Sequence, residues 1–130
     1  MATDPVRVLH AYLSTIPESA GLFLSASHIG RKTGEPALIV DGTGGHRVIR
    51  HRADRADITI HSYHHSLKAA ADLAYSVRER LLEELPGQVA GGGQVLDIAE
   101  VHSPFYLADE DTAEFRYVMA IAMYFTESHT

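Results

Sequence analysis

The sequence contains no cysteine among its 130 residues. Disulfide frameworks, zinc knuckles with thiolate ligands and thiol nucleophiles are therefore excluded. Apolar runs are also short: the longest, from Tyr117 to Phe125, falls far below the ~20 residues that a membrane-spanning helix needs. The first four residues lack the basic and apolar regions of a secretory signal peptide. These absences predict a soluble, cytosolic chain.

Positive charge is scarce, with 11 Lys and Arg residues against 17 Asp and Glu residues and a net charge of −6. This excess of acids argues against a protein that grips nucleic acid by neutralising phosphates. The cations are nevertheless concentrated, because residues 31–55 hold six cations and three acids, whereas residues 56–130 hold four cations and twelve acids. The basic segment suits binding of a polyanion, pairing with the acidic flank of another copy, or plain solvation in loops.

Two helices are predicted by their end signals. Asp4 followed by Pro5 is typical of a helix start, because Asp accepts hydrogen bonds from free amides and proline suits the first helical position. Pro17 ends this helix, since the residue before a proline is pushed out of the helical region. Ser66 is the expected N-cap of a longer amphipathic helix, which Pro86 ends.

The remaining segments are typical of strands: 21–26, 36–41, 46–51, 57–63, 94–101 and 115–126. The glycine-rich stretch 42–45 predicts a tight reversal, so residues 36–51 form a protruding hairpin arm. Segment 115–126 alternates bulky and smaller side chains, which predicts a central strand with helices on its bulky face. We therefore expect a single α+β domain over residues 1–130: a largely antiparallel sheet of about five strands, two helices on one face, and the hairpin.

Three histidines, His61, His64 and His65, resemble a metal site at first sight. On an extended strand the first and last of them lie about 13 Å apart at ~3.3 Å per residue, whereas zinc ligands all lie ~2 Å from the metal. The spacing therefore favours surface or interface histidines, with a small His-dependent metal-binding protein as an alternative.

Motifs for catalysis are missing from the sequence. Residues 30–33 depart from the phosphate-loop spacing, residues 42–45 precede a strand where a dinucleotide fingerprint precedes a helix, and no Gly-x-Ser-x-Gly turn occurs. We expect no enzyme, with no catalytic, cofactor-binding or metal-ligating residues.

Four stretches follow one another in a specific order: the alternating strand 57–63, the helix 70–81, residues 104–109, and the closing strand 115–121. With the first helix they cover nearly the whole chain. This order resembles the tail-terminator (tail-completion) proteins of long-tailed, siphovirus-type bacteriophages. The resemblance implies a virion structural protein that forms a ring, typically of six copies, which caps the tail tube, stops its polymerisation and joins it to the head.

The same resemblance implies the partners and the location. These are further copies of the chain, the tail-tube protein and a head-completion or connector protein, with DNA only as transient cargo through the ring, no cofactor and no membrane. The protein would lie in the virion tail at the head–tail interface, after assembly in the host cytoplasm.

A closed ring needs two different surfaces that meet head to tail. We expect four arginines to contact acids of the neighbouring subunit: Arg47, Arg50, Arg52 and Arg55. An acidic channel repels phosphates, and the expected lining acids are Asp97, Glu100, Asp109, Glu110 and Asp111. Two alternatives remain besides the metal-binding protein, namely another head–tail connector or tail-tube subunit and a nucleic-acid-binding module built on residues 31–55.

Overall fold

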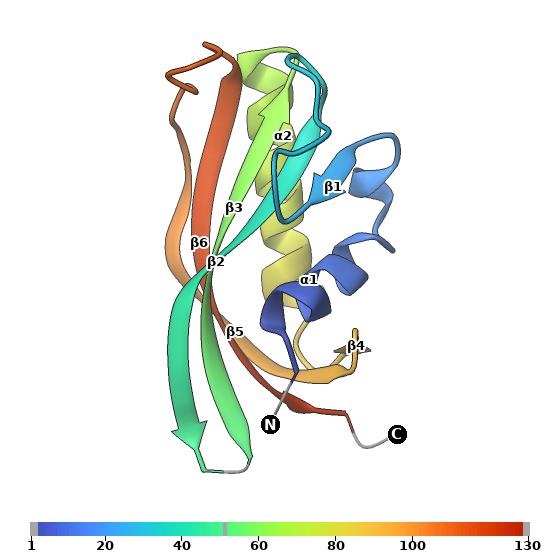
Figure 1. Cartoon of the computed structure of the whole chain (residues 1–130), viewed down its shortest axis with the longest axis vertical. Coiled ribbons are helices and arrows are strands. Elements are labelled where there is room, and N and C mark those ends of the chain that lie inside the picture. The colour runs from blue at the N-terminus through green and yellow to red at the C-terminus, as the bar shows by residue number, and fades with distance from the viewer. Residues whose placement is uncertain (1–2, 51, 129–130) are drawn as a thin grey trace.

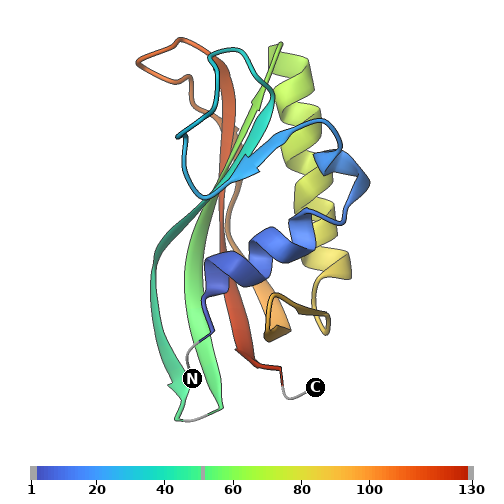
Figure 2. The same cartoon turned by 45° about the vertical axis from the view of Figure 1, so that its right-hand side comes forward.

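The computed structural model describes residues 3–50 and 52–128. The elements in chain order are α1 (Pro5–Leu13), the 3₁₀ turn η1 (Pro17–Ser19), β1 (Phe23–Ser25), β2 (Ala37–Ile49), β3 (Ala53–His64), α2 (Leu67–Glu79), the π-helical turn η2 (Arg80–Glu84), β4 (Val89–Ala90), β5 (Gly93–Tyr106) and β6 (Phe115–Glu127). One curled sheet has the order β1-β2-β3-β6-β5-β4, and every pairing except the parallel β1–β2 pair is antiparallel. The helices cover one face of it (Figures 1 and 2). Within the described residues, none of the helices has the length and apolarity needed to cross a membrane.

The expected α+β fold with two helices on one face is confirmed, with six strands in place of about five. The extra strand is β4, which pairs with the first two residues of β5. The strand expected over residues 94–101 extends to residue 106, and the strand expected over 57–63 begins at residue 53. Both strands are longer than expected because their pairing with β6 continues beyond the residues that alternate between apolar and polar.

The predicted helix starts are confirmed. Asp4 accepts a hydrogen bond from the Val6 amide at 3.0 Å, and Ser66 accepts one from the Ala69 amide at 3.0 Å. Helix α1 ends at Leu13, one turn before the residue that Pro17 was expected to displace.

The main core lies between the helices and the sheet. Strand β6 contributes the bulky residues of its alternating pattern, and the buried ones are Met119, Ile121, Met123 and Phe125. These pack with Ile58 and Ile60 of β3 and with Leu9, Leu13 and Val77 of the helices. The prediction of a central strand with helices on its bulky face is therefore confirmed for β6, which lies between β3 and β5.

The hairpin expected over residues 36–51 is wrong in its position. The chain does not reverse at 42–45 but between Ile49 and Ala53, and β2 continues through the glycines in register with β3. Gly44 and Gly45 do adopt positive φ angles, of 128° and 142°, but these angles accommodate a bulge between Gly42 and Gly44. Residue 51, the last of the expected hairpin, lies outside the described residues.

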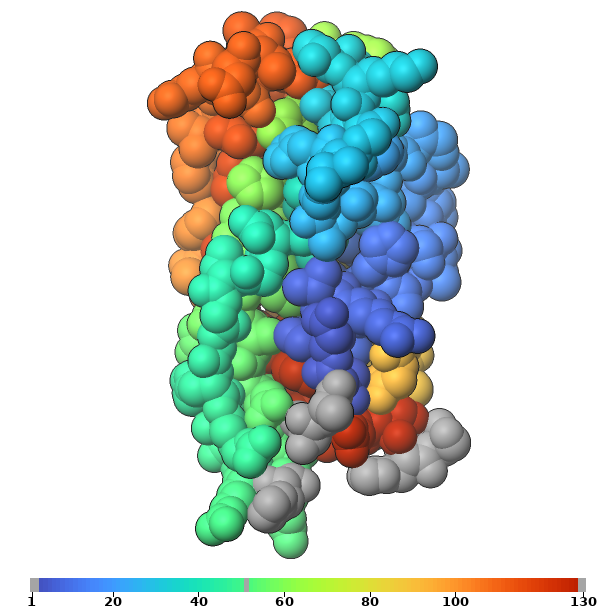
Figure 3. Space-filling model, viewed as in Figure 1, coloured from blue at the N-terminus to red at the C-terminus, as the bar shows by residue number. Residues whose placement is uncertain are grey.

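The far halves of β2 and β3 form an arm that extends past the helices (Figure 3). In β2 all residues from Asp41 to Ile49 are exposed, whereas residues 37–40 are buried. In the arm, defined here as residues 41–57, the β2 strand is exposed, whereas Ala53 and Ala56 of the β3 strand are buried and Ala56 belongs to the main core. It is the largest projection at the end of the molecule opposite the 26–36 and 107–114 loops (Figure 1).

Candidate assembly surfaces

The four arginines expected at a subunit interface all lie on the arm. Arg47 lies 3.6 Å from Asp54 across the two strands. Arg55 donates to Asp57 at 2.9 Å, which leaves both of these arginines partly neutralised within the subunit. The structure thus brings the four together on the arm formed by β2, β3 and the turn between them, while their contact with a neighbour stays a prediction.

Arg50 and Arg52 flank the turn at the tip of the arm. Both are exposed, and no ion pair among residues 3–50 and 52–128 includes either of them. A long cationic side chain on a projecting tip reaches a partner with little cost in desolvation. Of the four arginines expected at the interface, Arg50 and Arg52 are therefore the two that are in no ion pair within the described residues of the subunit.

The five acids expected to line a channel do not share one surface. Asp97 is paired in register with Tyr124, on the sheet face that carries no helix. Glu100 lies on the helix side, where its carboxylate accepts from Arg78 of α2 at 3.0 Å. The other three, Asp109, Glu110 and Asp111, lie in the turn between β5 and β6. Asp97 lies on the open face of the sheet, and Asp109 accepts from the hydroxyl of Tyr63, which lies on the same face, at 3.0 Å. Glu100 lies on the other face, so the five acids do not form one lining within a subunit.

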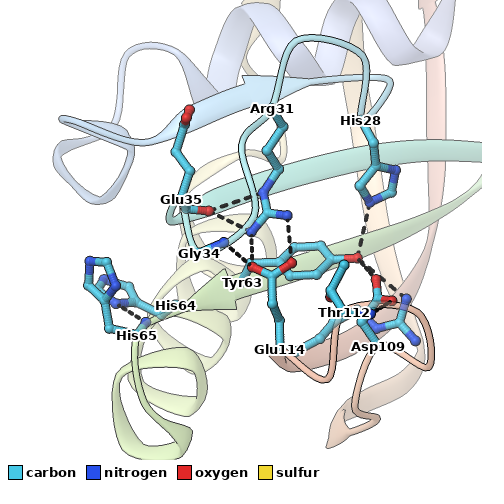
Figure 4. A network of polar contacts seen from close by, with 11 residues as sticks. His28, Arg31, Gly34, Glu35, Tyr63, His64, His65, Asp109, Thr112 and Glu114 are labelled. Atoms are coloured by element: carbon cyan, nitrogen blue, oxygen red, sulfur yellow. Dashed lines mark hydrogen bonds and ion pairs between the residues drawn. The ribbon is translucent and has the colours of Figure 1, made fainter.

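A buried ion pair joins the two loops at the end of the sheet opposite the arm (Figure 4). Arg31 donates to both carboxylate oxygens of Glu114, and the side chains are only 5% and 9% exposed. Glu114 also accepts from the Gly34 amide at 2.8 Å. The Arg31 guanidinium lies over the ring of Tyr63, a β3 residue, at 4.1 Å from the ring centre. The pair therefore clamps the loops 26–36 and 107–114 to the end of β3.

This cluster sets the protonation of its carboxylates. The hydrogen bonds from Arg31 hold the pKa of Glu114 at about 2, below its ordinary value of 4.5, and outweigh the effect of burial. Burial alone would raise the pKa of Asp109, but hydrogen bonds from the Tyr63 hydroxyl and from two backbone amides lower it. Burial raises the pKa of Tyr63, and its bond to Asp109 adds to that rise. Both carboxylates therefore stay ionised well into the acidic range.

Sequence reasoning missed the Arg31–Glu114 pair. The two residues are 83 positions apart, and nothing in the local spacing of either one points to the other. The sequence places Arg31 in the basic segment 31–55 and in residues 30–33, which depart from the phosphate-loop spacing, and neither pattern points to Glu114. Only the pairing of distant strands brings the two loops together.

The three histidines do not converge. His61 lies on the open sheet face, where its ring is 6.5 Å from that of His28, while the alternation of the strand directs His64 to the opposite face. The His64 ring accepts from the His65 amide at 2.9 Å. Burial, with a smaller contribution from Arg116, lowers the pKa of His61. Among the described residues, no cluster of three or more His, Asp or Glu side chains is arranged to hold a metal ion.

The fold defines the class of protein as a mixed α+β domain in which a curled six-stranded sheet carries both helices on one face and a long two-stranded arm. Neither a family model nor a curated protein matches the sequence. A solved structure does match: a chain in the virion of a native gene transfer agent (GTA) particle aligns with a TM-score of 0.66. The alignment covers 93% of this chain and 92% of that chain at 12% sequence identity. At this identity the likeness establishes a common fold.

Proposed function

We propose that this protein is a structural component of a phage-like virion, and that its copies form a ring at the end of the tail tube. The ring stops polymerisation of the tube and provides the joint to the head around a channel for DNA. It works by shape and assembly, without catalysis. The observation that carries the proposal is the shared fold with a virion chain over nearly the whole of both chains.

The distribution of charge supports assembly of like copies. The tip of the arm carries exposed arginines, whereas residues 56–130 hold twelve of the seventeen acids. A contact between two different patches of the same chain propagates from copy to copy, and it closes into a ring when the rotation per copy allows. The proposed partners are therefore further copies of the chain, the tail-tube protein and a head-side connector.

The test is the solution mass of the purified protein followed by electron microscopy with tail tubes. We expect a closed oligomer of defined mass, and one ring at one end of each tube. Addition of the protein during tube polymerisation should shorten the tubes in proportion to its concentration. A protein that stays monomeric at every concentration, and that leaves the length of the tubes unchanged, would refute the proposal.

Another connector or tail-tube subunit is the second candidate, because the fold likeness is to a virion chain of unspecified position. The same micrographs separate the two. A tail-tube subunit would add along the length of the tube and lengthen it, whereas a terminator would bind only at the end.

A further inference from the structure

Three irregular positions on the two long outer strands turn apolar side chains outward. In β5 the register skips residue 96 and then residue 101, so that Leu96 and Val101 are the unpaired extra residues of bulges. In β2 the register skips Val48 in the same way. The exposed fractions are 47%, 54% and 46%. A bulge re-aims the extra side chain, and each of these three bulges presents a branched apolar side chain to solvent.

Both strands also have an open edge. Strand β4 pairs with β5 only at Gly93 and Gln94, and β1 pairs with β2 only as far as Ile39. Proteins usually protect such edges with charged side chains or with bulges that disrupt pairing. The bulges are present here, so main-chain pairing with another copy is disfavoured, but the bulged residues themselves are apolar. Contiguous exposed apolar side chains, unlike single scattered ones, mark interaction surfaces, and Leu96 and Val101 lie on the same strand.

The two surfaces have opposite charge. The tip of the arm, residues 46–53, contains three arginines and no acid. Residues 93–114, which include the whole of β5, contain six acids and neither Lys nor Arg. Ile49, 51% exposed, adds to the apolar part of the tip. Of these acids, Glu100 is already paired with Arg78 and Glu114 is buried against Arg31. Asp97, next to Leu96, is exposed, and its sign is complementary to that of the tip arginines.

We propose that the arm tip of one copy docks on the bulged β5 edge of the next copy. Val48 and Ile49 pack against the edge residues Leu96 and Val101, and the tip arginines Arg50 and Arg52 face Asp97. The sheet order places β2 and β5 on opposite sides of the β3–β6 pair, so the two surfaces do not overlap and the contact is heterologous, as a ring requires. This inference rests on the ring proposed above and identifies the contact that builds it.

The experiment uses three double variants of the full chain, each of which replaces two exposed apolar residues by glutamate. The edge variant carries Leu96→Glu and Val101→Glu, and the arm variant carries Val48→Glu and Ile49→Glu. The matched control carries Ile29→Glu and Leu67→Glu, at positions 89% and 45% exposed that lie on neither surface. Circular dichroism checks that each is folded, and sedimentation and native mass spectrometry give the mass.

We expect the control to assemble like the wild type, and the edge and arm variants to sediment each as the 14.2 kDa monomer. An equimolar mixture of the two should give particles of twice that mass and no larger. The intact arm of the edge variant can occupy the intact edge of the arm variant, but the remaining two surfaces are both disabled. If a glutamate variant fails to fold, the milder pairs Leu96→Ser with Val101→Ser and Val48→Ser with Ile49→Ser should weaken assembly in the same way.

Three results would overturn the inference. The edge variant could assemble as the wild type does, or it could form dimers on its own through an arm-to-arm contact, or the mixture could remain monomeric. In each case the wild-type ring, and with it the proposed function, would stand. A wild-type protein that is itself monomeric refutes the proposed function, and the inference with it.

Discussion

At the scale of single residues, the Arg31–Glu114 pair is the most deeply buried ion pair in the described part of the chain. Two nearly buried charges lose most of their hydration, and their attraction compensates only while both are present. The bond from the Gly34 amide adds a further donor to the carboxylate. The pair therefore makes the geometry of two loops depend on one carboxylate.

Replacement Glu114→Gln should lower the free energy of unfolding by about 3 kcal/mol, because it leaves the Arg31 guanidinium buried without its counter-charge. Urea denaturation at neutral pH measures the change. Glu110→Gln is the matched control in the same loop, since Glu110 is exposed, and it should leave the midpoint unchanged. Equal stability of the two variants would show that the pair does not hold the loops.

The stabilisation from Glu114 should also depend on pH. Its pKa is about 2 in the folded protein and 4.5 ordinarily, so the unfolded chain takes up a proton on this carboxyl at a higher pH than the folded one does. The stabilisation is complete above about pH 5 and is lost as the pH falls towards 2. Wild type and Glu114→Gln should therefore converge in stability over this range, as denaturation at successive pH values would measure. A constant difference between them would contradict the assignment.

At the scale of elements, the arm depends on the glycines within β2. A Cβ added at Gly45, whose φ is 142°, would lie 2.1 Å from the carbonyl oxygen of Arg55 on the paired strand. At Gly44, with a φ of 128°, a Cβ would meet nothing within 4 Å. An alanine at either position would adopt a strained backbone conformation, but only the alanine at Gly45 would also clash with β3.

Gly45→Ala should therefore disrupt pairing in the arm, by the order of 1–3 kcal/mol from backbone strain with the clash in addition. Gly44→Ala bears the strain alone and serves as the control. Amide hydrogen exchange should accelerate in the arm of the Gly45 variant more than in that of the Gly44 variant. Exchange in α2 should stay as in the wild type. Equal effects of the two substitutions would contradict the close approach of β3 at Gly45.

At the scale of the whole molecule, the separation of the basic tip from the acidic remainder is the feature with consequences for assembly. The arm projects from the end opposite the two clamped loops (Figure 1), and none of its four arginines is a member of the main core. Substitution of these arginines therefore changes association without removing core side chains.

Replacement of Arg47, Arg50, Arg52 and Arg55 by glutamate should give a folded monomer that no longer assembles, as light scattering measures. Assembly of the wild type should also weaken with added salt, because exposed charges are screened within ~8–10 Å at moderate ionic strength. A control with Arg7→Glu and Lys32→Glu, exposed cations outside the arm, should assemble normally. Intact rings in the fourfold variant would refute the pairing of charges.

Local chemistry was sufficient to predict both helix starts, the alternating strand β6 and the α+β class. A cap needs only a side chain and the amides two or three residues away, and an alternating pattern needs only its own strand. The sequence also placed Arg47 and Arg50 on a projecting hairpin, but the predicted bounds of 36–51 left Arg52 and Arg55 outside it, and the turn was predicted at the wrong residues.

Tertiary structure alone decided where the arm reverses, which acids share a face, and which loops are joined. The glycines at 42–45 permit either a turn or a bulge, and the register with β3 selects the bulge. Glu100 faces α2 and Asp97 faces away because the strand pairing places them so, and Arg31 meets Glu114 only through the folded sheet. Such contacts join residues that are distant in the chain, and the local sequence around each residue does not show which distant residue it will meet.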